Sequence, residues 1–438
     1  MSRPVPTGVE DDLVEGDRVE LTVGAPAHGG HCVARIDGPH GRVVFVRHAL
    51  PGERVTAEIT ERHRGYLRAD AVEIHEASPD RVTPPCPWSH PGGCGGCDLQ
   101  HVADDAQLRW KTAVVREQLT RLAGLSPEDQ DRIFVRVEPL PGVTGPARLL
   151  GWRSRVRYAV DAADRPGLLQ HRSHEVVPID RCRIAHPAVQ DLDLLARTWP
   201  EQDSLQAVAT TGGDVAVLAR PAGSQAPALG DELADAPSAG GLVRLSGPPE
   251  VTEITGGRAW HVPVEGFWQV HPAAADTLVG VVLKMLRPAE GEVAWDLYGG
   301  AGLFAAALAA RTGARTTVVE SSPVGVAAAR ANLGGLPNVE VVAARVDAAL
   351  SRRRVTGPVD LVVLDPPRAG AGAKVVRAVA AAGPRAIAYV ACDPAALARD
   401  LATFRSVGWA ATEIRAFDCF PMTQHVECVA LLLPEPTA

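Results

Sequence analysis

Cys392 stands at a position where a thiol could act as a nucleophile. It follows AIAYVA, an apolar run typical of a buried strand, and it precedes DPAALARD, which predicts the start of a helix. The partial positive charge at the start of a helix lowers the pKa of a nearby thiol, and the thiolate is the reactive form. A buried cysteine is more often inert packing than a nucleophile, so it is the position of Cys392 that indicates catalysis.

Acidic residues stand at the ends of other predicted strands. Glu320 ends the strand TTVVE, and Asp365 ends VDLVVLD. The carboxyl ends of parallel strands meet at one rim of an α/β sheet, where ligands bind, so we expect both carboxylates to lie near Cys392. Glu427 lies just inside the apolar strand HVECVALLLP, where burying a carboxylate is costly. It is therefore either an acid or base with a raised pKa or a partly exposed residue at a sheet edge.

A glycine-rich turn, DLYGGAGLF, follows another predicted strand. Glycines let the backbone approach a ligand at the start of a helix. Their spacing does not match the G-x-G-x-x-G pattern of dinucleotide sites, and Glu320 could accept hydrogen bonds from ribose hydroxyls. Together these features favour S-adenosylmethionine over a nicotinamide cofactor. A structural turn beside a solvated acid is the alternative.

Cysteines also cluster in CPWSHPGGCGGCDLQH. The spacing is C-x7-C-x2-C, and a further cysteine in IDRCRIAHP could complete a set of four. Disulfides are rare in cytosolic proteins, so such a cluster suggests a metal. Four thiolates suit either an iron–sulfur cluster or structural zinc. The candidate ligands are Cys86, Cys94, Cys97 and Cys182.

The strands and helices that must position Cys392, the acidic residues and the glycine-rich turn begin near residue 291. From there, buried strands and helices alternate almost to the end of the chain. This alternation predicts a doubly wound parallel α/β sheet, and two further strands near ATEIRAF and HVECVALLLP would close one edge. We place this domain at residues 264–438.

The preceding part of the chain predicts two smaller units. In residues 10–76, apolar and polar residues alternate in short runs between Gly and Pro turns, which indicates a small antiparallel β-barrel of the OB-like type. Residues 81–263 are expected to form a mixed α+β central domain with the cysteine cluster. Within it we expect an amphipathic helix at 104–125 and a surface loop rich in Gly, Ala and Pro at 221–241.

Composition narrows the class of protein. The chain has 438 residues, of which 46% are apolar and 22% charged, as in ordinary multidomain globular proteins. No apolar run approaches the roughly 18 residues that span a bilayer, and the first residues lack a signal-peptide core. We therefore expect a cytoplasmic protein with no membrane partner. We also expect a monomer, although composition does not bear on that point.

The charge distribution suggests a nucleic-acid partner. The formal net charge is -8, but net charge averages over faces that can differ. Residues 35–68 contain seven arginines and residues 148–183 contain eight. We expect these segments to bind RNA phosphates, with Arg47, Arg62 and Arg155 among the contacts.

Several motifs connect these observations to a known family. In chain order they are GFWQVHP, DLYGGAGLF, DPPRAG, YVACDPAALARD and FPMTQHVE. Together they resemble the RNA uridine-5-methyltransferase family over nearly the whole chain. The stretches EGDRVELTVGAPAHGGHCVARIDG and VVFVRHALPGERVTAEI are similar to a TRAM domain, an RNA-binding barrel. The resemblance implies a C-terminal class I methyltransferase domain that uses S-adenosylmethionine.

The resemblance also implies roles for individual residues. Cys392 would add to carbon 6 of uracil as the nucleophile, and Glu427 would remove the proton from carbon 5 after methyl transfer. The residues that would line the S-adenosylmethionine site are Gln269, Tyr298, Glu320 and Asp365. This chain departs from the family at four positions. Leu303 stands where Asn is frequent, Ala391 and Asp393 replace Ser and Asn, and Met422 replaces Gln or His.

The same resemblance bears on the metal and on the RNA. CGGCDLQH is similar to the segment that holds a [4Fe-4S] cluster in many members, which favours such a cluster over zinc. Members with both a TRAM domain and a cluster resemble ribosomal RNA enzymes, so we expect 23S ribosomal RNA rather than transfer RNA as the substrate. A non-catalytic RNA-binding protein with a decayed methyltransferase fold is the alternative from another class. The presence of both Cys392 and Glu427 argues against it.

Overall fold

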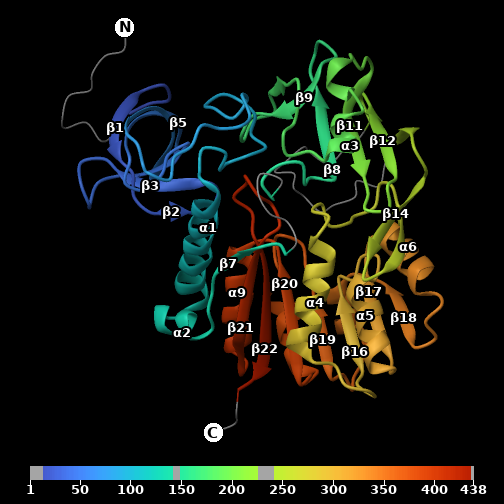
Figure 1. Ribbon diagram of the computed structural model, residues 1–438. Helices are drawn as coiled ribbons and strands as arrows, with labels where there is room; N and C mark the ends of the chain where they lie inside the picture. Colours follow the sequence, from blue (N-terminus) through green and yellow to red (C-terminus); the bar gives the residue numbers. More distant parts are fainter. Residues whose placement is uncertain (1–12, 142–147, 225–240, 436–438) are drawn as a thin grey trace.

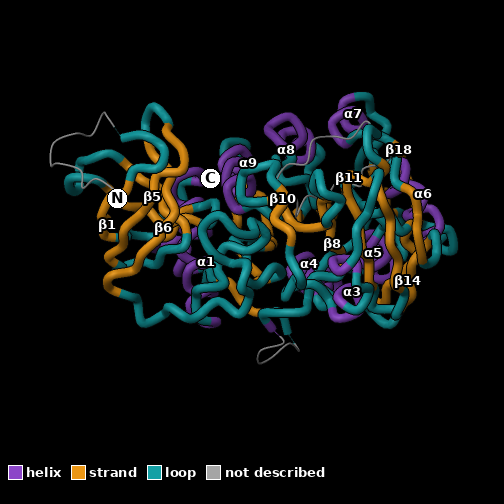
Figure 2. Tube along the Cα trace, turned by 90° about the horizontal axis from the view of Figure 1, so that it is seen from above, coloured by secondary structure: helices purple, strands orange, loops and turns teal. Residues whose placement is uncertain are grey.

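The computed structural model describes residues 13–141, 148–224 and 241–435. These residues form three larger sheets and a two-stranded ribbon. The first sheet forms a barrel at one end of the molecule, and the parallel sheet of the C-terminal domain reaches the other end (Figures 1 and 2). The predicted combination of a small barrel, a mixed central region and a doubly wound α/β domain is confirmed. No helix among the described residues is long and apolar enough to cross a membrane.

The barrel is built from strands in which alternate residues face inward. Val44 and Val46 of one strand are fully buried, whereas Phe45 between them is partly exposed. The sheet order is β1-β5-β6-β4-β3-β2, and the pairs are antiparallel except for the parallel pair β4–β6, which the sequence did not predict. The strands are β1 (Arg18–Thr22), β2 (Pro26–Ala27), β3 (His31–Arg35), β4 (Val43–Arg47), β5 (Arg54–Arg62) and β6 (Tyr66–Glu76).

A helix connects the barrel to the C-terminal sheet. Helix α1 (Asp104–Gln118), the predicted amphipathic helix, ends in a π-helical turn, η1 (Leu119–Ala123). It packs against β2 of the barrel and against α9 of the C-terminal domain (Figure 1). Helix α2 (Pro127–Arg132) follows, and then the short strand β7 (Val137–Pro139), which joins the edge of the C-terminal sheet.

The central sheet has the order β10-β9-β8-β11-β12-β13. The stretch GLLQHRSHEVVPID forms a hairpin of two short strands, β9 and β10, and most of the loop expected at 221–241 lies outside the described residues. The elements are β8 (Arg155–Val160), β9 (Pro166–Leu169), β10 (Val176–Pro178), α3 (Pro187–Gln190), η3 (Leu194–Ala196), β11 (Gln202–Ala209), β12 (Val215–Pro221), β13 (Val243–Ser246) and the ribbon β14 (Glu250–Thr255) with β15 (Arg258–Pro263).

The C-terminal sheet has the order β18-β17-β16-β19-β20-β22-β21-β7, and β16 to β20 run parallel. Its strands are β16 (Ala294–Leu297), β17 (Thr316–Glu320), β18 (Val339–Ala343), β19 (Leu361–Leu364), β20 (Ala386–Ala391), β21 (Trp409–Asp418) and β22 (Glu427–Pro434). The helices are α4 (Ala274–Leu286), α5 (Leu303–Thr312), α6 (Pro323–Leu333), α7 (Val346–Ser351), α8 (Gly372–Ala381) and α9 (Pro394–Arg405). Because neighbouring parallel strands end at one rim, this topology brings the predicted site residues together.

Candidate active site

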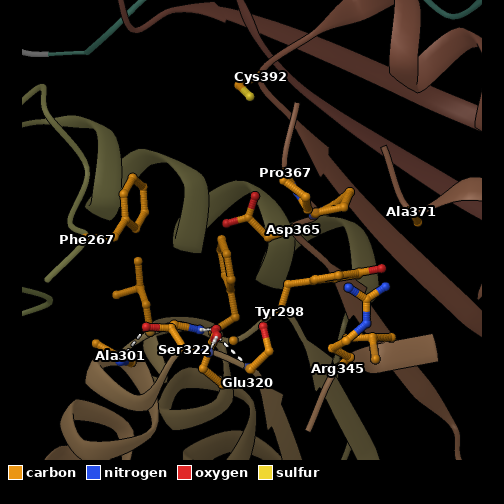
Figure 3. Close-up of a pocket in the computed structure, with 18 of the residues that line it drawn as sticks. Phe267, Tyr298, Ala301, Glu320, Ser322, Arg345, Asp365, Pro367, Ala371 and Cys392 are labelled. Atoms are coloured by element: carbon orange, nitrogen blue, oxygen red, sulfur yellow. Dashed lines mark hydrogen bonds between the residues drawn. The ribbon is translucent and has the colours of Figure 1, made fainter. Parts of the chain in front are cut away.

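A cavity of about 780 Å³ lies at the carboxyl-end rim of the C-terminal sheet. The side walls come from the glycine-rich turn after β16 and from the segment between β15 and α4. All the residues predicted for catalysis and for cofactor binding line it, namely Gln269, Tyr298, Glu320, Asp365, Cys392 and Glu427. Cys392 lies toward one end of the cavity, Glu320 toward the other, and Asp365 lies between them (Figure 3).

The glycine-rich turn has a backbone that few side chains would permit. Tyr298 has a φ of 67°, and its N–H donates to the carbonyl of Val319 over 2.9 Å. Gly302 has a φ of 91°, and a Cβ there would lie 2.4 Å from the Leu333 side chain. The glycine is therefore required both by the conformation and by close packing against α6. The backbone of this turn therefore forms part of the cavity wall.

Glu320 is fixed to the cavity wall by backbone N–H groups. Its Oε1 accepts from Ser321 N and Ser322 N, each over 2.6 Å, and its Oε2 accepts from Gly300 N over 2.9 Å. Ser322 also caps α6, because its hydroxyl accepts from Gly325 N. Each carboxylate oxygen can accept more than one hydrogen bond, so the group can still bind ligand hydroxyls.

Asp296 is a buried carboxyl group beneath the turn that the sequence did not single out. Its pKa is raised to about 7, mainly because the group is buried. The hydrogen bond from Ala305 N acts against this rise, and the charge of Glu320 adds to it. Ala305 N donates to its Oδ2 over 2.8 Å, which ties the end of β16 to the first turn of α5. Asp296 therefore supports the glycine-rich turn from below.

The sequence analysis also missed charged residues at the far wall of the cavity. Asp347 follows β18 and lies between Arg345 and Lys374, with Arg345 Nε at 3.1 Å and Lys374 Nζ at 3.8 Å from its carboxylate. Asp347 is the second residue of α7 and lies four positions past a strand that is only partly buried, so the rule that located Glu320 and Asp365, a polar residue just after a buried strand, would not have located it.

Cys392 and Glu427 are brought together by strand register. Strands β20 and β22 are antiparallel, and their last pair is Ala391 opposite Cys428. One residue further along the same register, Cys392 lies opposite Glu427. Opposite residues of an antiparallel pair point to the same face, and both of these side chains line the cavity. Glu427 is 3% exposed, so the alternative of a partly exposed edge residue is wrong.

The loop before Glu427, residues 419–426, and the end of β21 are held from α1. The ammonium of Lys111 donates to Asp418 Oδ1 over 2.5 Å and to the carbonyls of Phe420 and His425 over 3.0 and 2.9 Å. Arg148 donates to the other oxygen of Asp418 over 3.1 Å. The side chains of Lys111 and Asp418 are both fully buried. This ion-paired network fixes the course of the loop that delivers Glu427 to the cavity.

The barrel also contacts the surroundings of Cys392. Asp393 caps α9, because its Oδ1 accepts from Ala396 N over 2.7 Å. Its Oδ2 lies 2.9 Å from Nε2 of His28, which belongs to the turn between β2 and β3. Gly29 N of the same turn donates to Gln424 Oε1 over 2.8 Å. The turn at residues 28–30 therefore bridges the barrel, helix α9 and the loop before Glu427.

The cysteine cluster forms a second, smaller pocket. All the predicted ligands line it, together with Arg153 and Arg183. Among the described residues, however, no group of three or more His, Cys, Asp or Glu is arranged to hold a metal ion. The cysteine segment also contacts the loop before Glu427, since the N–H groups of Asp98 and Leu99 both donate to the carbonyl of Met422. Residues next to the cysteine cluster thus hydrogen-bond to the loop that leads to Glu427.

The prediction that Arg47 and Arg155 contact RNA is wrong. Arg155 is 8% exposed; it is 3.4 Å from Glu253 and donates to the carbonyls of Val264 and Gly266. Arg47 is 7% exposed and lies 3.7 Å from Asp98. Both side chains are therefore engaged in contacts within the protein and are not available to bind RNA phosphates. Arg62, by contrast, is exposed.

Comparisons with known proteins agree with this geometry. Residues 13–72 match the TRAM domain family, and residues 257–435 match the family described as tRNA (Uracil-5-)-methyltransferase. An uncharacterized RNA methyltransferase of Streptomyces avermitilis is 51% identical, with 96% of this chain and 99% of the relative covered. One from Bifidobacterium longum is 38% identical, with 94% and 96% covered.

A solved structure shares the fold along almost the whole chain. It is the Pyrococcus abyssi tRNA (uracil-54, C5)-methyltransferase in complex with S-adenosyl-L-homocysteine. The TM-score is 0.69 at 22% sequence identity, with 95% of this chain and 100% of that chain covered. At this identity the similarity shows a common fold.

Proposed function

This chain belongs to the S-adenosylmethionine-dependent RNA (uracil-5-)-methyltransferase family, and from that premise we propose that it methylates a uridine through a covalent bond between Cys392 and the uracil ring. The observation that carries this proposal is the placement of Cys392 opposite Glu427 in the cavity that also holds the glycine-rich turn. Carbon 5 of uracil is too weakly nucleophilic to attack a methyl sulfonium without activation.

The two residues would act at opposite ends of the reaction. The thiolate of Cys392 forms a bond to carbon 6, and the electron pair of the 5,6 double bond moves into an enolate that makes carbon 5 nucleophilic. S-adenosylmethionine, when bound, supplies the electrophilic methyl group. Glu427 then takes the proton from carbon 5, the double bond re-forms, and the bond to Cys392 breaks. Glu427 is buried and lines the cavity that would hold the ring.

S-adenosylmethionine would bind in the part of the cavity that lies away from Cys392, near Glu320. We assign the ribose hydroxyls to Glu320, which backbone N–H groups hold in place, and the remaining predicted contacts to Gln269, Tyr298 and Asp365. Asp347, in the first turn of α7, would be a further acceptor. Two of the departures from the family can be located. Leu303 lines the cavity. Asp393 caps helix α9, a role that the Asn found in other members could also fill.

We propose 23S ribosomal RNA as the substrate and transfer RNA as the alternative. The combination of the TRAM domain with four converging cysteines favours ribosomal RNA. The name of the matching family and that of the Pyrococcus abyssi enzyme favour transfer RNA. Nucleosides from a strain that lacks the protein would decide: we expect 5-methyluridine to be lost from 23S ribosomal RNA. Its loss from transfer RNA alone would instead support the alternative.

We further propose that the cysteine pocket holds a [4Fe-4S] cluster. The donor set is four thiols that share one pocket, and Arg153 and Arg183 could balance the negative charge of the ligated group. Zinc would bind each sulfur at about 2.3 Å and so requires the thiols to crowd around a single ion. The described residues show no group arranged for either occupant, so it is the similarity of CGGCDLQH to the cluster-binding segment of the family that favours the cluster over zinc. Methyl transfer moves no net electrons, so the group would act as a scaffold or in RNA contact.

Protein purified without oxygen is expected to be brown and to contain about four iron atoms per chain. Cys94→Ala should lose the iron, because one ligand of the set is removed. Cys32→Ala is the matched control, since Cys32 is a buried cysteine of the barrel and should leave the iron content unchanged. Iron and zinc are measured together by mass spectrometry; stoichiometric zinc in the untreated protein would contradict the assignment.

A further inference from the structure

The loop between β19 and α8, residues 365–371, forms one wall of the cavity. In Figure 3, Asp365 at the start of this loop lies between Cys392 and Glu320, and Ala371 marks its other end. The residues of the loop that line the cavity are Asp365, Pro366, Pro367, Gly370 and Ala371. The position of the loop therefore sets the space that is left between the nucleophile and the cofactor.

Helix α8, which follows this loop, begins without a cap of its own. Ala371 occupies the N-cap position, and its side chain has no acceptor for a hydrogen bond. The first turn of the helix contains no acidic residue. The free N–H groups at the start of a helix are commonly satisfied by such nearby side chains. For α8 the acceptor must come from another part of the chain.

Asp400, in the middle of α9, supplies this acceptor. Its Oδ2 accepts from Ala371 N over 2.7 Å, and Gly372 N donates to both carboxylate oxygens over 3.2 Å. Asp400 is only 4% exposed, and a buried carboxylate is costly unless it is hydrogen-bonded. Its negative charge is also favourable at the start of α8, where the helix dipole is positive. A residue of α9 thus caps α8 and holds the end of the loop.

Tyr389 of β20 completes this arrangement. Its hydroxyl donates to Asp400 Oδ2 over 2.5 Å and accepts from Ala371 N over 3.0 Å. Burial, followed by the charge of Asp400, raises the pKa of Tyr389, so the phenol keeps the proton that it donates. The ring is fully buried and meets Phe404 of α9 edge to face. Tyr389 therefore joins the strand, the helix and the loop.

Gly370 allows the loop to pass close to Asp400. Its φ is 88°, and a Cβ at this position would lie 2.7 Å from Asp400 Oδ2. Its N–H donates to the carbonyl of Pro367 over 2.8 Å, which closes a turn within the loop. A larger residue would push the loop away from the carboxylate, so both the conformation and the close approach require glycine.

The two residues that hold the loop are also tied to the nucleophile. Tyr389 precedes Cys392 by three residues, and Asp393, directly after Cys392, caps the helix that carries Asp400. Strand β20 also pairs with β19, whose end leads into the loop. The same strand and helix that place the thiol therefore determine where the loop lies.

We infer that Asp400 and Tyr389 are positioning residues for methyl transfer, which hold the loop at residues 365–371 in register with Cys392. Reacting atoms must be held about 3–3.5 Å apart, and a misplacement of about 1 Å can reduce the rate about 10²-fold. Neither side chain lines the cavity, so both act through the loop. The link to methyl transfer rests on the proposed function.

The first measurement is the single-turnover rate of methyl transfer by full-length variants, together with their affinity for S-adenosylmethionine. Asp400→Ala should lower the rate about 10- to 100-fold, because the loop loses its acceptor. The affinity should change much less, since Glu320 is held by a different part of the chain. Asp400→Asn should recover most of the rate, because the amide oxygen can accept from Tyr389 and Ala371. Tyr389→Phe should cost less than Asp400→Ala, since the carboxylate remains.

The second measurement is hydrogen exchange of the folded variants, which reports on the loop without any reaction. Backbone amides of residues 369–375 should exchange faster in Asp400→Ala than in Asp400→Asn or the unaltered protein. Asp360→Ala is the matched control. Asp360 precedes β19 at the end away from the cavity, and its carboxylate accepts from Val293 N over 2.8 Å. This control should change neither the rate nor the exchange of the loop.

An unchanged rate in Asp400→Ala would overturn the inference, as would a slower rate without faster exchange of the loop or an equal loss of rate in Asp360→Ala. If Asp400→Ala did not fold, Tyr389→Phe would carry the test, and no effect of that variant on rate or exchange would overturn the inference. If the unaltered protein formed no methylated uridine, the proposed function would be wrong. Faster exchange in Asp400→Ala would then still show that Asp400 holds the loop.

Discussion

Replacing Cys392 by alanine is expected to reduce methyl transfer on the order of ten-thousandfold or more, because nothing else activates carbon 5 of the uracil. The variant should still bind S-adenosylmethionine and RNA, since Cys392 occupies one end of the cavity and Glu320 the other (Figure 3). The measurement is single-turnover transfer of a labelled methyl group, with mass spectrometry of the protein to detect covalently bound RNA.

Cys428→Ala serves as the control for this experiment. Cys428 is a fully buried thiol directly after Glu427, but it pairs with Ala391 in the interior of the sheet. The control should retain most of its activity. Substantial methylation by Cys392→Ala, or equal losses in the two variants, would remove Cys392 from the proposed mechanism.

Glu427→Gln is expected to separate methyl transfer from product release. The amide keeps the size of the side chain but cannot take the proton from carbon 5, so turnover should fall about 10²- to 10⁴-fold. Addition of the thiolate and transfer of the methyl group precede this step and should continue. The enzyme should therefore accumulate as a denaturation-resistant adduct with methylated RNA, detectable by gel shift and by mass spectrometry.

RNA that contains 5-fluorouridine provides the matching trap for the unaltered enzyme. Fluorine at carbon 5 cannot leave as a proton does, so the reaction should stop at the same covalent stage. If neither the Glu427→Gln variant nor the fluorinated RNA produced an adduct, the covalent mechanism would be wrong. An adduct with Cys392→Ala would show that a different residue is the nucleophile.

The sequence predicted the C-terminal fold and the location of the cavity because local patterns determine both. Glu320, Asp365 and Cys392 each follow an apolar run, and the topology of a parallel sheet brings the ends of such runs together. Glu427 comes from an antiparallel strand, so its position depended on register. A shift of one residue between β20 and β22 would have turned its side chain to the other face of the sheet.

Other features depended on contacts that no local pattern contains. Lys111 and Asp418 are 307 positions apart, and neither stands in a motif that would suggest a buried pair. Counting arginines in a segment likewise could not show that Arg155 would point into the molecule toward Glu253. The contact between the rings of His31 and His171 also required the structure, because His31 belongs to the barrel and His171 to the turn between β9 and β10.

The network around Asp418 limits how this enzyme could be divided or recombined in evolution. Asp418 belongs to the methyltransferase sheet, yet the two cations that contact it, Lys111 and Arg148, both precede the central sheet in the chain. A segment that began at residue 264 would contain the cavity but would lack both cations, so Asp418 and the carbonyls of Phe420 and His425 would lose the donors that hold the loop before Glu427. The catalytic domain is therefore not a self-sufficient module. An exchange of the N-terminal half with that of another protein would have to supply both cations at once.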